Sequence, residues 1–219
     1  MAGEFAIGTR WDVTRARIRL RKIKGGYGRA VSAAANRTAR EMRTDASRRI
    51  RKRFAIKKRD LDKHIEIVKA SRSRPIARII FQKTDRPSLK AFGLKQRWGR
   101  KRRSRKASGP TGSAASAVTP RRQGKGVSYR IEKGSKRKKI KQAFGADESV
   151  WRTLGGHAYK RTGQKRFPIV LLKGLSAWAM MKSPKYNIEP AWKERGRKRF
   201  VHHLDDQVRF RLVRAAGKA

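Results

Sequence analysis

The most regular pattern of apolar and polar positions in the chain lies between residues 29 and 53. Apolar side chains recur there at steps of three and four, which is the period of an α-helix. They are Val31, Ala35, Ala39, Met42, Ala46 and Ile50. The stripe is mostly alanine, so this helix can approach a neighbour closely. The arginines that lie off the stripe are Arg37, Arg40, Arg43, Arg48 and Arg51. We therefore predict a long, closely packed helix with a basic outer face.

Further helices are predicted on both sides of a central β-rich region. A long C-terminal helix starts near Glu189 and Pro190, and its apolar positions are Trp192, Phe200, Val201, Leu204, Val208 and Leu212. A short apolar helix over residues 175–181 precedes it and ends before Pro184, because proline does not continue a helix. A second short helix is expected over 57–62, with Asp60 as a candidate cap.

Alternation of basic and apolar residues predicts a strand near the N-terminus. In residues 15–21, Ala16, Ile18 and Leu20 would share one face of an extended segment, and four arginines would share the other. The glycine-rich segment Gly25–Gly28 then breaks the pattern. We predict an amphipathic strand followed by a turn.

Runs of β-branched residues bounded by turn residues predict a sheet in the middle of the chain. One hairpin is expected from residues 65–68 and 76–81, and a second from 150–161 and 167–172 with its turn at 162–165. Single strands are expected at 89–92 and 126–132.

These elements together predict an α+β fold, in which a long N-terminal helix and a C-terminal helix pack on a small, mostly antiparallel sheet with extended basic loops. Three parts are expected along the chain. Residues 1–28 form an N-terminal arm with the amphipathic strand, residues 29–186 form a core domain with a basic insert at 97–125, and residues 187–219 form the C-terminal helix.

Charge narrows the classes of partner. The 219 residues include 62 Lys and Arg against 15 Asp and Glu, a formal net charge of +47. Self-repulsion at this charge opposes a compact isolated monomer and favours binding to nucleic acid or to an acidic protein surface. Hydrophobic residues make up 37% of the chain, which allows one modest core. The absence of cysteine excludes disulfides and thiolate metal sites and fits a reducing compartment.

Two basic clusters, residues 97–106 and 136–139, are the candidate polyanion-binding segments, and Arg121 and Arg122 lie between them. The candidate binding residues are Arg97, Arg100, Lys101, Arg102, Arg103, Arg105, Lys106, Arg121, Arg122, Lys136, Arg137, Lys138 and Lys139. Contacts of this kind neutralise phosphates without reading bases, so they predict sequence-independent and salt-dependent binding. No zinc-finger spacing, ribonucleoprotein aromatic motif or leucine zipper indicates base readout.

No constellation of residues predicts catalysis, a metal or a cofactor. Adjacent His202 and His203, with Asp205 and Asp206, would point about 100° apart on a helix, so we interpret them as helix surface and predict no metal site. Ser176 has elbow-like spacing from Gly174, but Trp178 replaces the second glycine, which favours a core position. The glycine clusters lack the lysine and hydroxyl of a phosphate loop. We predict that the protein is not an enzyme and binds no cofactor.

A membrane location is not expected. The longest apolar stretch, residues 167–181, is interrupted by Lys173 and is shorter than the roughly 20 residues that a membrane-spanning helix needs. The N-terminal residues lack the basic and apolar regions of a secretory signal, so we expect synthesis in a cytoplasm.

Several segments resemble those of a known family, the bacteriophage minor tail protein Z family. They are 33–40 (Ala-Ala-Ala-Asn-Arg-Thr-Ala-Arg), 46–61 (beginning Ala-Ser-Arg-Arg-Ile and ending Ile-Lys-Lys-Arg-Asp-Leu), 89–93 (Leu-Lys-Ala-Phe-Gly), 126–131 (Gly-Val-Ser-Tyr-Arg-Ile), 140–144 (Ile-Lys-Gln-Ala-Phe), 156–161 and 165–169. The resemblance spans roughly residues 30 to 181. The chain departs from the family in the more basic insert and in the basic C-terminal helix, which carries Lys193, Arg195, Arg197, Lys198 and Arg199.

The resemblance implies a structural virion protein of a tailed phage, made in the host cytoplasm: a tail completion or head–tail joining component at the head-proximal end of the tail. It further implies a homo-oligomer, a hexameric ring around or near the DNA path. Implied partners are other phage tail and neck subunits, with the basic loops against packaged double-stranded DNA or an acidic protein surface.

Composition alone leaves two other classes open. A cellular ribosome-type or nucleoid protein shares the high Lys and Arg content and would bind nucleic acid without sequence preference. An adaptor for an acidic protein partner would need no nucleic acid at all. Co-purification with virions or with ribosomes separates the first two, and nuclease treatment identifies the third.

Overall fold

The computed structural model describes residues 3–7, 10–23, 25–98, 124–141, 143–144, 156–163 and 168–217. The chain divides into two compact units. Unit 1 comprises residues 1–87 and 174–219, and unit 2 comprises residues 88–173. The fold is α+β, as predicted. The expected division at residues 28/29 and 186/187 stays a prediction.

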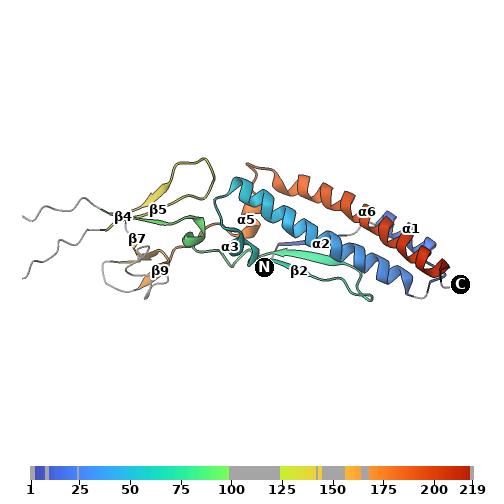
Figure 1. Cartoon of the computed structure of the whole chain (residues 1–219). Coiled ribbons are helices and arrows are strands. Elements are labelled where there is room, and N and C mark those ends of the chain that lie inside the picture. Colours follow the sequence, from blue (N-terminus) through green and yellow to red (C-terminus); the bar gives the residue numbers. More distant parts are fainter. Residues whose placement is uncertain are drawn as a thin grey trace, which may run out of the picture. The chain divides into compact units, whose positions relative to one another are not determined.

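Unit 1 is built around two long helices, α2 (Gly26–Arg53) and α6 (Ile188–Ala216), which lie side by side along much of their length (Figure 1). Both long helices were predicted, and every residue of the predicted apolar stripe of α2 is buried. From α6, buried residues that include Trp192, Phe200, Leu204 and Val208 complete this core. Small alanines on α2 and Gly196 on α6 allow the two backbones to come close.

A three-stranded antiparallel sheet packs on α2 in the order β1-β3-β2, with β1 (Gly3–Ile7), β2 (Ile65–Val68) and β3 (Ala77–Phe81). The predicted hairpin of β2 and β3 is confirmed. Strand β1 was not predicted. Unit 1 also contains α3 (Lys58–Asp62) and α5 (Ala177–Met181), the two predicted short helices.

Unit 2 consists of small antiparallel sheets. One has the order β4-β5-β6, with β4 (Lys95–Trp98), β5 (Gly124–Tyr129) and β6 (Lys138–Ile140). The other has the order β7-β8-β9, with β7 (Ala143–Phe144), β8 (Tyr159–Arg161) and β9 (Ile169–Leu171). Val127, Ala143 and Ala158 form a buried cluster. The predicted strand at 126–132 is confirmed for residues 126–129, since β5 ends at Tyr129, and the pairing of the second hairpin is confirmed within the described residues.

The predicted strand at residues 15–21 is wrong, because α1 (Arg10–Arg19) is a helix there. Ala16 and Leu20 are both buried, whereas Ile18 between them is 70% exposed. A strand would place all three on one face, but a helix places only the residues four apart together. Contacts of α1 with α2 and α6 stabilise the helical choice.

The predicted strand at 89–92 is also wrong, since these residues form the 3₁₀-helix η1 (Leu89–Phe92). Leu89, Ala91 and Phe92 are all buried, which a strand with alternating faces could not achieve on one side. Gly93 ends the turn with a φ of 65°. The suggested cap Asp60 lies inside the first turn of α3, and the N-cap position is Lys57.

Candidate polyanion-binding site

The structure describes some of the predicted polyanion-binding residues and not others. Arg97 lies in β4, but its side chain is outside the described part of the chain. The other predicted residues outside the described ranges are Arg100, Lys101, Arg102, Arg103, Arg105, Lys106, Arg121 and Arg122. Lys136, Arg137, Lys138 and Lys139 are described, at the start of β6 and just before it.

The β5–β6 pairing positions the described basic cluster. Lys138 pairs with Tyr129 and Lys139 pairs with Ser128 in antiparallel register. Successive residues of a strand point to opposite faces, so Lys138 and Lys139 present their ammonium groups on the two sides of the sheet. Both are exposed, and so is Lys136. These three lysines can meet an anionic surface without any rearrangement of the sheet.

Arg137 has a different environment from its neighbours. Its guanidinium donates to the carbonyl oxygens of Gly93 and Ser128, and its Nε donates to Oγ of Ser128 at 3.3 Å. Burial lowers the pKa of Arg137, and the charge of Arg130 lowers it further. Arg137 therefore connects β5 to the loop after η1, and it offers a phosphate less free hydrogen-bonding capacity than the lysines do.

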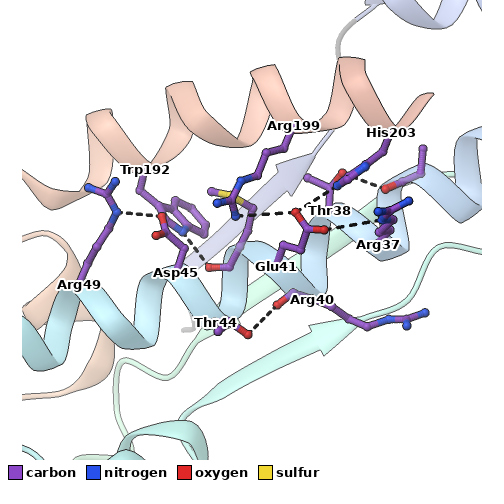
Figure 2. A network of polar contacts seen from close by, with 12 residues as sticks. Arg37, Thr38, Arg40, Glu41, Thr44, Asp45, Arg49, Trp192, Arg199 and His203 are labelled. Atoms are coloured by element: carbon purple, nitrogen blue, oxygen red, sulfur yellow. Dashed lines mark hydrogen bonds and ion pairs between the residues drawn. The ribbon is translucent and has the colours of Figure 1, made fainter. Parts of the chain in front are cut away.

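A polar network joins α2 to α6 around Glu41, as Figure 2 shows. Nε2 of His203 lies 3.1 Å from Oε2 of Glu41, and Nη1 of Arg199 lies 3.8 Å from the same oxygen. Arg37 approaches the other carboxylate oxygen at 3.6 Å. Within the described residues, neither ring nitrogen of His203 has an aligned hydrogen bond, so its contact with Glu41 is a close approach of poor donor geometry.

The pKa of Glu41 reflects this crowded environment. Burial by itself would raise the pKa, but the contact with His203 and the positive charges of His203, Arg199 and Arg37 together lower it below its ordinary value. Ionised Glu41 therefore bridges the two long helices.

The interpretation of the histidine pair as helix surface is wrong for His203, which is only 5% exposed. His202 is exposed, and the two rings and Asp206 place one ligand atom each within 4.8 Å of one another. Arg37 lies 4.0 Å from Asp206. Its guanidinium, and that of Arg199 beside Glu41, would repel a cation placed among these groups. We therefore interpret the cluster as a contact between helices.

Two serines are candidate nucleophiles, and both make hydrogen bonds that belong to the fold. Ser176 is the N-cap of α5, and its Oγ accepts a hydrogen bond from the backbone N–H of Ala179 at 3.2 Å. Oγ of Ser88 lies 2.9 Å from Nδ1 of His157. Burial lowers the pKa of His157, and the charge of Lys90 lowers it further. A nucleophilic triad also needs a carboxylate on the histidine, and none contacts His157 in the part of the chain that the structure describes.

Within the described ranges, no helix combines the length and apolar content that crossing a bilayer would require.

Among the comparisons with known proteins, a family model matches the chain. The family model described as prophage minor tail protein Z (GPZ) matches residues 13–214. The match includes α2 and all but the last two residues of α6, and it reaches beyond the span on which the sequence resemblance rests. Searches of curated proteins and of solved structures found no match.

Proposed function

The chain belongs to the prophage minor tail protein Z family, and on that premise we propose that it is a tail completion or head–tail joining component. Members of this family are structural phage tail proteins, which are not a class of enzymes, and a phage tail protein is part of the virion. In our proposal the protein occupies the head-proximal end of the tail as a hexameric ring around or near the DNA path, and its neighbours are other tail and neck subunits.

The exposed lysines of the β6 region carry the DNA-facing part of this proposal. Lys136, Lys138 and Lys139 are exposed and can meet phosphates, and a strand with lysines on both faces can contact a charged backbone without selecting a sequence. A surface of tail or neck subunits rich in Asp and Glu would satisfy the same charges.

Net charge favours assembly with an anionic partner. At +47, copies of the chain repel one another, and an anion that reaches several subunits offsets this repulsion. We expect the ring to form more readily on DNA or on acidic tail subunits than in the purified protein alone. Native mass spectrometry with and without duplex DNA measures this difference.

Duplex binding by the full-length chain tests the DNA contact. We expect affinity for unrelated duplexes to be similar and to fall steeply between about 50 and about 500 mM salt. The triple variant Lys136→Gln/Lys138→Gln/Lys139→Gln should lower the salt slope by about two to three, since each neutralised phosphate contributes about 0.9. Equal affinity of the natural chain at the two salt concentrations would exclude the DNA contact.

A matched control separates this site from total charge. Lys57, Lys58 and Lys63 are exposed lysines at α3, in unit 1. Changing these three to glutamine removes the same charge from another surface, and we expect it to alter the salt slope much less. Similar effects of both triple variants would mean that general charge, not the β6 cluster, binds the duplex.

Imaging of whole particles tests the placement. Cryo-electron microscopy of virions should find the protein as a ring between head and tail. Its absence from purified tails, with recovery in ribosomes or bulk nucleoid instead, would support a cellular nucleic-acid-binding protein and contradict the proposal.

A further inference from the structure

An open surface cavity of about 590 Å³ in unit 1 is lined by exposed arginines from three separate segments. Arg17 comes from α1, Arg21 from the turn that follows it, Arg29 from the first turns of α2 and Arg72 from the β2–β3 loop. No acidic residue of the described chain lines this cavity. We call it the arginine cavity.

Helix α6 brings a further arginine, Arg211, close to Arg29 and Arg72. Burial lowers the pKa of Arg211 on α6, and the charges of Arg29, Arg214 and Arg72 lower it further. Arginine keeps its proton in proteins, so the lowered pKa describes a cation held close to other cations. Nε of Arg211 is buried and meets no hydrogen-bond acceptor among the residues that the structure describes. An anion at this place would relieve the repulsion.

Backbone geometry holds the arginines together. A Cβ on Gly28 would lie 2.9 Å from the carbonyl oxygen of Arg72, so only glycine lets the β2–β3 loop come this close to the start of α2. The side chain of Asn36 fastens the same loop to the helix: Nδ2 donates to the carbonyl oxygen of Ala70 at 3.0 Å, and Oδ1 accepts from its N–H at 2.7 Å. Arg29 and Arg72 are thereby kept near each other, and no carboxylate is among the described residues that line the cavity with them.

The start of α2 adds a smaller contribution. Gly25 is the N-cap, with a φ of 66°, and provides no side-chain cap, and the first turn contains no acidic residue. The partial positive charge of a helix N-terminus favours an anion here. This contribution only reinforces the four lining guanidinium groups.

We propose that the arginine cavity binds a phosphate group, and that the phosphodiester backbone of duplex DNA supplies it. A tetrahedral phosphate accepts hydrogen bonds from several directions, which suits guanidinium groups that arrive from several elements. The identity of the phosphate source rests on the DNA contact proposed above. The site is separate in sequence and in unit from Lys136–Lys139.

The test uses the full-length chain with the double variant Arg29→Gln/Arg72→Gln. At about 150 mM salt we expect its affinity for duplex DNA to fall about tenfold and its salt slope to fall by about one. The matched control is Arg59→Gln/Arg197→Gln, which removes two exposed arginines from α3 and α6 outside the cavity. The control should retain most of the affinity. Equal losses in both double variants would overturn the assignment of the site.

A second measurement follows the cavity directly. Titration of inorganic phosphate should shift the backbone amide resonances of Gly26 and Gly28 in the natural chain, and the double variant should lose these shifts. No shift with phosphate and no shift with duplex DNA would overturn the phosphate site.

The two measurements, duplex affinity and amide shifts with phosphate, together identify the source of the phosphate. They also show whether this proposal and the proposed function fail separately. Shifts with phosphate, together with unchanged duplex affinity in Arg29→Gln/Arg72→Gln, would identify a site for free phosphate and contradict the DNA assignment. Loss of duplex binding only on substitution of Lys136, Lys138 and Lys139 would leave the DNA contact standing and remove the cavity from it.

Discussion

Trp192 on α6 donates its indole N–H to the main-chain carbonyl oxygen of Met42 on α2, at 2.9 Å, inside the buried interface of the two long helices (Figure 2). The two residues are 150 positions apart in the chain. The ring of Trp192 also packs edge-on against Phe81 of β3, so this residue joins both long helices to the sheet of unit 1. Its replacement measures how far that unit depends on one contact.

Trp192→Phe keeps an aromatic ring and removes the hydrogen bond, so we expect a loss of about 1 kcal/mol in the free energy of unfolding. Trp192→Ala also leaves a cavity and should cost about 3–5 kcal/mol. Urea denaturation followed by far-UV circular dichroism measures both. Natural stability in Trp192→Phe would show that the indole N–H contributes nothing.

Gly196 on α6 faces the side chain of Met42 on α2. A Cβ at Gly196 would lie 3.1 Å from Cε of Met42, the flexible end of that side chain. Gly196→Ala should therefore be accommodated and stabilise α6 by up to about 1 kcal/mol, because alanine favours helix. Gly196→Leu should overpack the interface and cost about 1–3 kcal/mol. Thermal unfolding of the two variants checks the opposite signs, and equal destabilisation by both would contradict this view of Met42.

Asn36 holds the β2–β3 loop through both polar groups of Ala70. Asn36→Ala should cost about 1–3 kcal/mol, because it leaves the N–H and carbonyl oxygen of Ala70 without their partner. Hydrogen exchange should rise in residues 69–74. Thr44→Ala is the matched control, since its exposed Oγ donates to the carbonyl oxygen of Arg40, four residues earlier in the same helix, and it should change stability by less than about 0.5 kcal/mol.

Because the pKa of Glu41 is lowered, we expect the stability of the interface between the long helices to depend on pH. Its pKa is lower in the folded chain than its ordinary value of 4.5, so its ionised form stabilises the fold above pH 4.5. This contribution is lost as pH falls through the lowered folded value. Glu41→Gln should therefore be less stable than the natural chain at neutral pH, and the difference should shrink below pH 4.5.

The size of this effect is limited, because the Glu41 side chain is 38% exposed. Solvent screening keeps the expected loss at neutral pH to at most about 1 kcal/mol. Denaturation from pH 3 to 7 measures the difference. Glu194→Gln removes a carboxylate from the exposed face of α6 and should show a smaller one. A difference that grows in acid would contradict the assigned sign.

Arg137 and Lys139 should respond differently to truncation. Arg137→Ala removes the donors to Gly93 and Ser128, so amide exchange in β5 and β6 should rise, with a local loss of about 1–2 kcal/mol. Lys139→Ala changes an exposed side chain and should leave exchange near the natural rate. Unchanged exchange in Arg137→Ala would mean that its contacts do not hold the strands.

The sequence pattern was sufficient to predict a helix or hairpin where the pattern was long and repeated. The stripe of α2 contains six apolar positions at helical spacing, and the β2–β3 hairpin contains two β-branched runs around turn residues. Short segments were harder to predict. Residues 16, 18 and 20 fit a strand by alternation, and residues 16 and 20 fit a helix by their spacing of four, so only packing of α1 against α2 and α6 decided between them.

The exposed lysines of the β6 region were identifiable as a candidate site because they are neighbours in the sequence. The arginine cavity was not, since Arg17, Arg29 and Arg72 belong to three segments that only folding brings together. His203 had no signal of burial either, because Glu41, its partner, lies on the other long helix.

Composition and periodicity alone thus determined a basic protein with two long helices and antiparallel hairpins, and the family came from the resemblance of particular segments. These properties depend on residue types and on spacings within about 30 positions, where helix and strand geometry is regular. Tertiary structure decided which charged side chains are exposed, as Lys139 is, and which are held by the backbone, as Arg137 is. It also decided which arginines meet, because charge–charge contacts depend on distance in space, and positions 29, 72 and 211 become neighbours only in the folded chain.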